Sequence, residues 1–385
     1  MKSTTTQKAN IPLHKPHVDD RVFEYIREVL DRGKISGDGP MCRSVEEMMQ
    51  KTFSIRHVLL TTSCTHALEM GMMMLDLQPG DEVIMPSFTF VSTANAVLRA
   101  GGRPVFCEIN DRTCTIDVND LERRITKRTR AIIPVHYAGV SAEMDEILAI
   151  ARRHKLSVVE DAAQGVNARY KGKSLGAIGD AGAFSFHDTK NYVAGEGGAF
   201  VTNDEAIARK GEIIREKGTN RSNFLRGEVD KYTWVETGSS FILSEILAAV
   251  LKFQFEMLDD IQVRRKHIHE LYMNGLKDLE QSGKLRLPII PEYCDSNYHI
   301  FYILTRNESD HTMLMRRLKE FGIGGTFHYV PLHSAPYAIK NLGTQGLQLP
   351  VTDRIYNTLI RLPIYPQLEG ADVAYIIEKI RECLK

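Results

Sequence analysis

The segment HVLLTTSCTHALEMGMMML (57–75) shows a pattern that the chain then repeats, in which a short apolar run is followed by residues at helical spacing. Strands that alternate with helices are typical of βαβ units, in which helices cover a mostly parallel sheet. The sequence therefore predicts an α/β fold from Val58 to Phe200. The later apolar runs of the series are DEVIMP (81–86), RPVFCEI (103–109), RAIIPV (130–135) and LSVVED (156–161).

The pattern changes after residue 180. The runs GAFSFH (182–187) and GGAFVTND (197–204) have no full helix between them, so antiparallel or edge strands are expected there. One long helix is expected at about residues 243–275, because its apolar residues recur at helical spacing. Isolated strands and helices follow. The expected strands are KLRLPII (284–290), YHIFYILT (298–305) and GIGGTFHYV (322–330), and the expected helices are TMLMRRLKEF (312–321) and DVAYIIEKIRECL (372–384).

The length of 385 residues exceeds what one hydrophobic core usually organises. We therefore predict three parts. Residues 1–10 form a flexible tail, residues 11–250 form a large α/β domain, and residues 251–385 form a long connecting helix with a small C-terminal α+β domain.

The composition narrows the possible partners. Lys and Arg number 49, as do Asp and Glu, and no basic patch appears, so nucleic acid is not an expected partner. The longest apolar stretch, 67–77, contains two acidic residues and is shorter than the roughly 20 residues of a membrane span. No membrane partner is expected. The first residues, MKSTTTQKANIP, include no apolar segment of signal-peptide length, so a cytoplasmic location is expected.

The cysteine and histidine spacing indicates no metal centre. The 6 cysteines include no Cys-x-x-Cys pair and are expected to be reduced. The pairs His267-x-His269 and His14-x-x-His17 have no third ligand at a useful spacing, so no metal site is predicted.

Polar residues directly after strands are candidates for a ligand site, because ligands bind beyond the carboxyl ends of strands in an open α/β sheet. Ser63, Cys64 and Thr65 follow a strand and begin a helix, where free N–H groups suit a phosphate. Plain N-capping explains the hydroxyl residues equally well. Asp161 ends the apolar run LSVVED, where it could bind a cation or cap the next helix.

Two more candidates carry a lysine and an aromatic ring. Lys190 lies in FSFHDTKN (184–191), shortly before the glycines of GEGG (195–198), although an isolated lysine is usually a solvated surface residue. Phe90 ends PSFTF (86–90) and could lie across a planar ligand or belong to the core. A phosphate site, an aromatic face, a carboxylate and a lysine amine together match pyridoxal 5′-phosphate (PLP), whose aldehyde bonds to lysine and whose ring nitrogen needs an acid.

From about Ile11 to the C-terminus, the chain resembles the DegT/DnrJ/EryC1/StrS family of sugar-nucleotide aminotransferases, which have the fold type I architecture. The resemblance is greatest to the dTDP-4-amino-4,6-dideoxygalactose transaminase subgroup. The family motifs are ISGDGP (35–40), PSFTFVSTANAV (86–97), VVEDAAQG (158–165), FSFHDTKN (184–191) and GEGG (195–198). The subgroup motifs are TTSCTHALEM (61–70), PVHYAGV (134–140), REKGTNRSNFLRGEVDKYTW (215–234), GSSFILSE (238–245) and FHYVPLH (327–333).

The resemblance implies a role for each site residue. Lys190 would be the Schiff-base lysine, Asp161 the partner of the pyridinium nitrogen, and Phe90 the ring that stacks on the cofactor. Gln164 would lie beside the phenolic oxygen of the cofactor. The phosphate would be held by the backbone amides of Cys64 and Thr65 and by the hydroxyl of Ser185.

The resemblance also implies an assembly and a reaction. Many relatives place an asparagine where this chain has Ser240, and that residue reaches the cofactor of the partner subunit in a homodimer. The implied reaction is transfer of the amino group of glutamate to dTDP-4-dehydro-6-deoxyglucose, which gives dTDP-4-amino-4,6-dideoxygalactose and 2-oxoglutarate. The gluco epimer and a 3-keto sugar substrate stay open, as does a non-catalytic sensor of nucleotide sugars. The related dehydratases have histidine in place of the lysine, and Lys190 disfavours them.

Overall fold

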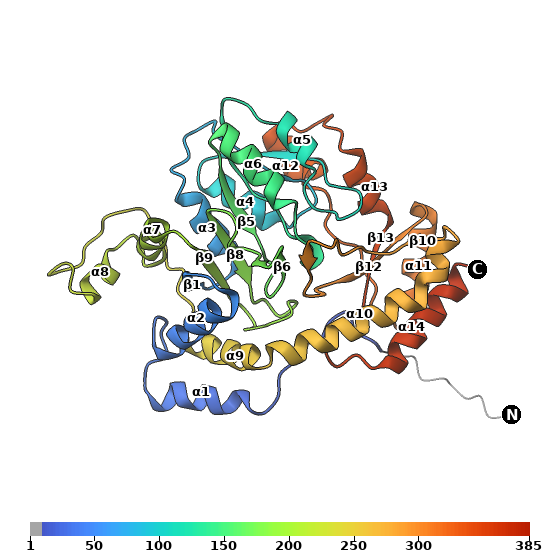
Figure 1. Cartoon of the computed structure of the whole chain (residues 1–385), viewed down its shortest axis with the longest axis horizontal. Helices are drawn as coiled ribbons and strands as arrows, with labels where there is room; N and C mark the ends of the chain where they lie inside the picture. The colour runs from blue at the N-terminus through green and yellow to red at the C-terminus, as the bar shows by residue number, and fades with distance from the viewer. Residues whose placement is uncertain (1–9) are drawn as a thin grey trace.

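A computed structural model describes residues 10–385, so residues 1–9 of the expected tail lie outside the described part. A seven-stranded sheet with the order β1-β9-β8-β5-β4-β2-β3 forms the centre of the molecule (Figure 1). Its strands confirm the apolar runs expected from the sequence. They are β1 (His57–Thr61), β2 (Glu82–Pro86), β3 (Arg103–Cys107), β4 (Thr129–Ile132), β5 (Ser157–Asp161), β8 (Ala181–Ser185) and β9 (Gly198–Thr202).

The sheet is parallel except at β9, which runs antiparallel to both of its neighbours, β1 and β8. The antiparallel arrangement expected after residue 180 is therefore confirmed. The carboxyl ends of the other strands lie at one edge of the sheet, and β9 begins at that same edge. The α/β fold class is confirmed, and the topology brings the ends of β1, β2, β5 and β8 together.

Side chains of each strand alternate between two helical layers, as the pleat requires. On β1, Leu59 packs in a core cluster with α3 (Cys64–Met73) and α4 (Val91–Arg99). Val58 and Leu60 belong to a cluster on the other face, with α2 (Pro40–Phe53) and α9 (Glu245–Glu256). The remaining helices of this part are α1 (Val22–Asp31), α5 (Val118–Arg123), α6 (Met144–His154), α7 (Glu205–Arg215) and α8 (Arg221–Leu225).

The C-terminal part contains its own three-stranded sheet of β10 (Leu285–Arg286), β12 (Phe301–Thr305) and β13 (Leu359–Leu362). A long helix, α10 (Leu258–Gln281), runs toward it from α9 (Figure 1). The prediction of one helix over 243–275 is wrong, because Met257 has φ −97° and ψ 10° and separates α9 from α10. The other helices are α11 (Glu308–Glu320), α12 (Pro336–Leu342), α13 (Pro350–Thr358) and α14 (Gly370–Cys383).

The prediction of a strand at GIGGTFHYV (322–330) is also wrong. This segment makes only single bridges, at Ile323 and Thr326, and otherwise forms a loop. Ile11 bonds to the backbone of Gly322 and Gly324, but no ladder continues from that bridge, and Tyr329 has a φ of 26°, outside the extended region of a strand. A further small sheet has the order β11-β6-β7, formed by β6 (Arg169–Tyr170), β7 (Lys173–Ser174) and β11 (Cys294–Asp295).

The cysteines are free thiols, and all but Cys383 are buried. Among residues 10–385, no helix combines the length and the apolar character that crossing a bilayer requires.

Candidate active site

A cavity of about 580 Å³ lies at the carboxyl edge of the large sheet. It brings together residues that are far apart in the sequence, because the turns that follow β1, β2, β5 and β8 meet there. Ser240 does not line this cavity and is exposed on the segment that leads to α9. The predicted site residues that do line it are Cys64, Thr65, Phe90, Asp161, Gln164, Ser185 and Lys190.

Asp161, the last residue of β5, is buried. Its Oδ2 accepts a hydrogen bond of 2.7 Å from the hydroxyl of Thr93, and its Oδ1 accepts one of 3.2 Å from the N–H of Ala163. Burial raises the pKa of Asp161, while the bond from Thr93 opposes that change. No cation forms an ion pair with this carboxylate within the described residues. Asp161 is therefore a buried acid whose hydrogen bonds come from neutral donors only.

Lys190 lies in the loop that joins β8 to β9. Its backbone N–H donates to the carbonyl of His187, which closes a turn, and its side chain lines the cavity. Burial is the main cause that lowers the pKa of the Lys190 amine; Cys64 and Asp161 act in the opposite direction. A lowered pKa makes the neutral, nucleophilic amine more available at neutral pH.

The turn between β1 and α3 provides free N–H groups at the cavity. The Ser63 side chain caps the helix by accepting from the N–H of His66 at 3.2 Å, which confirms the capping alternative for that residue. The Thr65 hydroxyl instead bonds to the hydroxyl of Ser92 at 2.8 Å. The backbone N–H groups of Cys64 and Thr65 lie in the first turn, where a helix offers them no carbonyl partner.

Gly198 allows this turn to lie against β9. A side chain at position 198 would place its Cβ 2.4 Å from the backbone nitrogen of Cys64, which is closer than real Cβ contacts. Ser185, at the end of the neighbouring strand β8, lines the same region of the cavity. The last glycine of the GEGG motif is therefore required because a side chain there would prevent the N-terminus of α3 from packing against β9.

Gln164 and Phe90 line the cavity in different ways. The buried Gln164 accepts from the N–H of Ala138 at 2.7 Å and donates to the Tyr329 hydroxyl at 2.7 Å, so its amide is fixed in one orientation. Phe90 is 57% exposed, and its ring centroid lies 6.3 Å from that of Tyr329. An exposed ring at the edge of a cavity can cover a planar ligand.

The structure adds residues that the sequence did not single out. Thr93, in PSFTFVSTANAV (86–97), does not line the cavity itself but donates a hydrogen bond to Asp161, which does. The rings of His328 and Tyr329 stack with centroids 3.7 Å apart, and His328 bonds through Nδ1 to the hydroxyl of Tyr137 at 2.8 Å. The only sequence signal for His328 and Tyr329 is their place in the subgroup motif FHYVPLH (327–333). His299 and Arg361 had no signal in the sequence.

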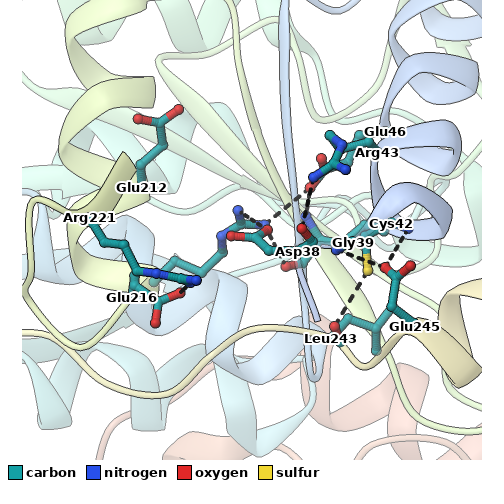
Figure 2. Close-up of polar contacts among 12 residues, drawn as sticks. Asp38, Gly39, Cys42, Arg43, Glu46, Glu212, Glu216, Arg221, Leu243 and Glu245 are labelled. Atoms are coloured by element: carbon teal, nitrogen blue, oxygen red, sulfur yellow. Dashed lines mark hydrogen bonds and ion pairs between the residues drawn. The ribbon is translucent and has the colours of Figure 1, made fainter. Parts of the chain in front are cut away.

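A buried carboxylate, that of Glu245, binds the end of the ISGDGP segment (35–40) and the start of α2. Glu245, at the start of α9, accepts hydrogen bonds of 2.9 Å from the N–H groups of Gly39 and Cys42 (Figure 2). It also accepts one of 2.8 Å from the N–H of Met41. The Cys42 thiol donates to the carbonyl of Leu243 at 3.5 Å. A carboxylate at the N-terminus of α2 satisfies free N–H groups and complements the helix dipole.

Arg215 connects the same segment to β1. Its guanidinium forms ion pairs with Asp38 at 2.7 Å and with Glu46 at 3.1 Å, and it donates to the carbonyl of Leu60 at 3.1 Å. Glu46 also accepts from the N–H of Leu60 at 2.9 Å. Since the β1–α3 turn begins two residues after Leu60, this network holds the base of the turn that provides the N–H groups.

These residues fit PLP as predicted. Asp161 lacks a cationic partner within residues 10–385, and a pyridinium nitrogen would supply one. The N-terminus of α3 offers backbone donors for a phosphate, and the Lys190 amine lines the same cavity. The donor set therefore matches the distinct chemical groups of the cofactor.

Comparisons with known proteins agree with this arrangement. The profile of the DegT/DnrJ/EryC1/StrS aminotransferase family matches residues 16–381. The spore coat polysaccharide biosynthesis protein SpsC of Bacillus subtilis is 33% identical over 392 residues, which cover 98% of this chain and 99% of that protein.

Two solved structures have the same fold. DesV of S. venezuelae, in complex with a ketimine intermediate, is 32% identical with a TM-score of 0.86, and covers 98% of this chain and 99% of its own. The PMP form of the putative sugar aminotransferase Spr1654 of Streptococcus pneumoniae is 25% identical with a TM-score of 0.90, and covers 97% and 98% of the two chains. The chain therefore belongs to the DegT/DnrJ/EryC1/StrS aminotransferase family.

Proposed function

We propose that this protein transfers the amino group of L-glutamate to C4 of dTDP-4-dehydro-6-deoxy-D-glucose, which gives dTDP-4-amino-4,6-dideoxy-D-galactose and 2-oxoglutarate. As a member of its family, the chain is a PLP-dependent sugar aminotransferase. The observation that carries the proposal is that Lys190 and the buried Asp161 line one cavity beside the N-terminus of α3. The sugar and its nucleotide are taken from the subgroup motifs.

Each proposed role follows from the surroundings of the residue. When bound, PLP supplies a carbonyl that joins to amines and a ring that takes up electrons. The Lys190 amine removes the proton from the α-carbon of the donor in the first half of the reaction and delivers a proton to sugar C4 in the second. Asp161, as a carboxylate, keeps the proton on the ring nitrogen. The N–H groups of Cys64 and Thr65 and the hydroxyl of Ser185 bind the phosphate.

Product analysis tests this proposal directly. The purified protein with PLP, glutamate and the dTDP-4-keto sugar should release 2-oxoglutarate and form the 4-amino sugar. In the galacto product H4 is equatorial, so NMR should show a small H3–H4 coupling, whereas the gluco epimer would show a large one. A large coupling would favour the gluco alternative. Absence of 2-oxoglutarate with this substrate, but release of it with a 3-keto sugar, would favour the other substrate class. If neither sugar gives 2-oxoglutarate, the non-catalytic sensor of nucleotide sugars would be favoured.

We also propose a homodimer that acts in the cytoplasm. The segment around α8 projects from the body of the molecule beyond α7 (Figure 1). Large apolar side chains are exposed on it, and Trp234 is the most exposed at 77%. Covering these side chains with a second copy would bury them, and Ser240 follows on the same segment. Light scattering that gave a monomer at assay concentration would contradict the dimer. The exposed set is Phe224, Leu225, Tyr232, Trp234 and Val235.

The division into a large domain at 11–250 and a C-terminal part at 251–385 stays a proposal. Its support is the separate sheet and core cluster of the C-terminal part. Ile11 packs in that same cluster and bridges to Ile323, so the chain enters the large domain after first contacting the small one.

A further inference from the structure

A buried contact joins two segments that line the cavity from distant parts of the chain. Ser87 directly follows β2, and His333 is the last residue of the FHYVPLH segment (327–333). Both side chains are buried. The N–H of His333 donates to the Ser87 hydroxyl at 3.0 Å, and the same hydroxyl lies 2.8 Å from Nδ1 of the His333 ring. The N–H of Leu332 also donates to the carbonyl of Ser87 at 3.0 Å, so three hydrogen bonds join the segments.

The His333 ring accepts the proton of the Ser87 hydroxyl. Within residues 10–385 this hydroxyl has no other acceptor, so its proton points to Nδ1. Nε2 lies 3.5 Å from Oδ1 of Asp353, which favours a proton on that nitrogen. Burial lowers the pKa of His333, and the carboxylates of Asp353 and Glu108 act in the opposite direction, so the ring is neutral at neutral pH. A neutral ring with its proton on Nε2 keeps Nδ1 free to accept.

Tyr329, four residues before His333, has a backbone conformation that needs support. Its φ of 26° lies in the left-handed region, where a bulky side chain is strained. A strained residue keeps its conformation only where the surrounding structure holds it. The bonds at Leu332 and His333 hold the segment on its C-terminal side. The bridge between Thr326 and Arg361 holds it on the N-terminal side, so the strained residue is fixed from both directions.

The conformation of Tyr329 determines how Gln164 faces the cavity. The Tyr329 hydroxyl accepts from Nε2 of Gln164 at 2.7 Å, which leaves the second Nε2 hydrogen for a ligand. We propose that His333 is a positioning residue, which keeps Tyr329 in the conformation that orients Gln164 toward the cofactor. This inference rests on the proposed use of PLP, with its phenolic oxygen beside the Gln164 amide as the family resemblance implies.

The absorbance of bound PLP reports on this arrangement. An N–H donor beside the phenolic oxygen favours its deprotonated form, so a misplaced Gln164 amide should raise the pH midpoint at which the absorbance of the holoenzyme changes. His333→Leu removes the ring acceptor, and this midpoint should rise by about one pH unit or more. His333→Asn places an amide oxygen near the position of Nδ1, so its midpoint should stay close to that of the wild type. Loss of stability alone would not move the midpoint, because it is measured on folded holoenzyme.

Two further variants show whether the effect passes through Gln164. Gln164→Met removes the donor and should raise the midpoint by itself. Adding His333→Leu to it should then cause no further rise. His269→Leu is the matched control, since His269 is also a buried histidine of the C-terminal part but does not line the cavity. It should keep the midpoint of the wild type.

An unchanged midpoint in His333→Leu would overturn the proposal. Equal rises in His333→Leu and His333→Asn, an equal rise in His269→Leu, or a further rise in the double variant would overturn it too. If His333→Leu does not fold by circular dichroism, Ser87→Ala decides, because it removes the hydroxyl on the other side of the bond, and an unchanged midpoint there would overturn the proposal. An unchanged midpoint in Gln164→Met would refute the cofactor position as well as the inference that rests on it. Because no sugar is used, failure of the proposed sugar substrate would leave this comparison valid.

Discussion

Replacing Thr93 by valine tests the role of Asp161 without altering the carboxylate itself. The Thr93 hydroxyl donates to Asp161 Oδ2 at 2.7 Å and also contacts the hydroxyl of Thr89 at 2.8 Å. Valine keeps the branched shape of threonine, and only the donor is lost. The remaining hydrogen bond to the carboxylate comes from the N–H of Ala163 at 3.2 Å.

The size of the effect follows from the kind of bond. A buried hydrogen bond to a charged group contributes about 1.5–3 kcal/mol. If that contribution is lost in the transition state, kcat falls by about 10- to 150-fold at neutral pH. Thr93 opposes the effect of burial on the pKa of Asp161, so the pKa should rise further in Thr93→Val. Because Asp161 works as a carboxylate, a higher pKa moves the acidic limb of the kcat profile to higher pH.

The assay is the pH dependence of kcat and of KM for both substrates, in wild type, Thr93→Val and Thr89→Val. Thr89 lines the cavity and bonds to Thr93 but not to Asp161, so its variant should keep the acidic limb of the wild type. If the acidic limb of the kcat profile lies at the same pH in wild type and in Thr93→Val, the reasoning is refuted. Equal shifts in both variants would show that the effect comes from general disturbance of the cavity.

Three further substitutions probe other parts of the site. Lys190→Ala should abolish turnover and remove the absorbance of covalently held cofactor, and an active variant would end the assignment. Glu245→Gln should lower the free energy of unfolding by about 2–4 kcal/mol in urea, because charge-assisted bonds to the start of α2 are lost; Glu270→Gln, on the exposed face of α10, should change it by less than about 0.5 kcal/mol. Equal values for the two variants would contradict the role of Glu245. Gly198→Ala should weaken PLP binding in a spectroscopic titration, because its Cβ would meet the first residue of α3 at 2.4 Å. Gly370→Ala, where the nearest atom is 3.9 Å away, is its control, and equal affinities would argue against the close approach.

Several structural predictions failed where local pattern and tertiary packing disagree. The segment 322–330 has the apolar and aromatic content of a strand, but it pairs only through single bridges at Ile323 and Thr326, so it forms no ladder. β13 was not predicted, because its four residues, LIRL (359–362), are too few to show an alternating pattern. The break at Met257 could not be predicted from periodicity, because apolar residues keep helical spacing on both sides of it.

The sequence by itself determined the α/β class, the strands of the large sheet and the residues Lys190, Asp161 and Cys64 as candidates, and the family resemblance added Ser185. These are local properties, because apolar periodicity and polar residues at strand ends depend on neighbours along the chain. Only the tertiary structure decided that Thr93 supports Asp161, that Gln164 is oriented by Tyr329, and that Arg361 of the C-terminal part reaches the cavity wall. Such contacts join residues separated by tens or hundreds of positions, and their geometry exists only after the sheet has formed and the C-terminal part has packed beside its carboxyl edge.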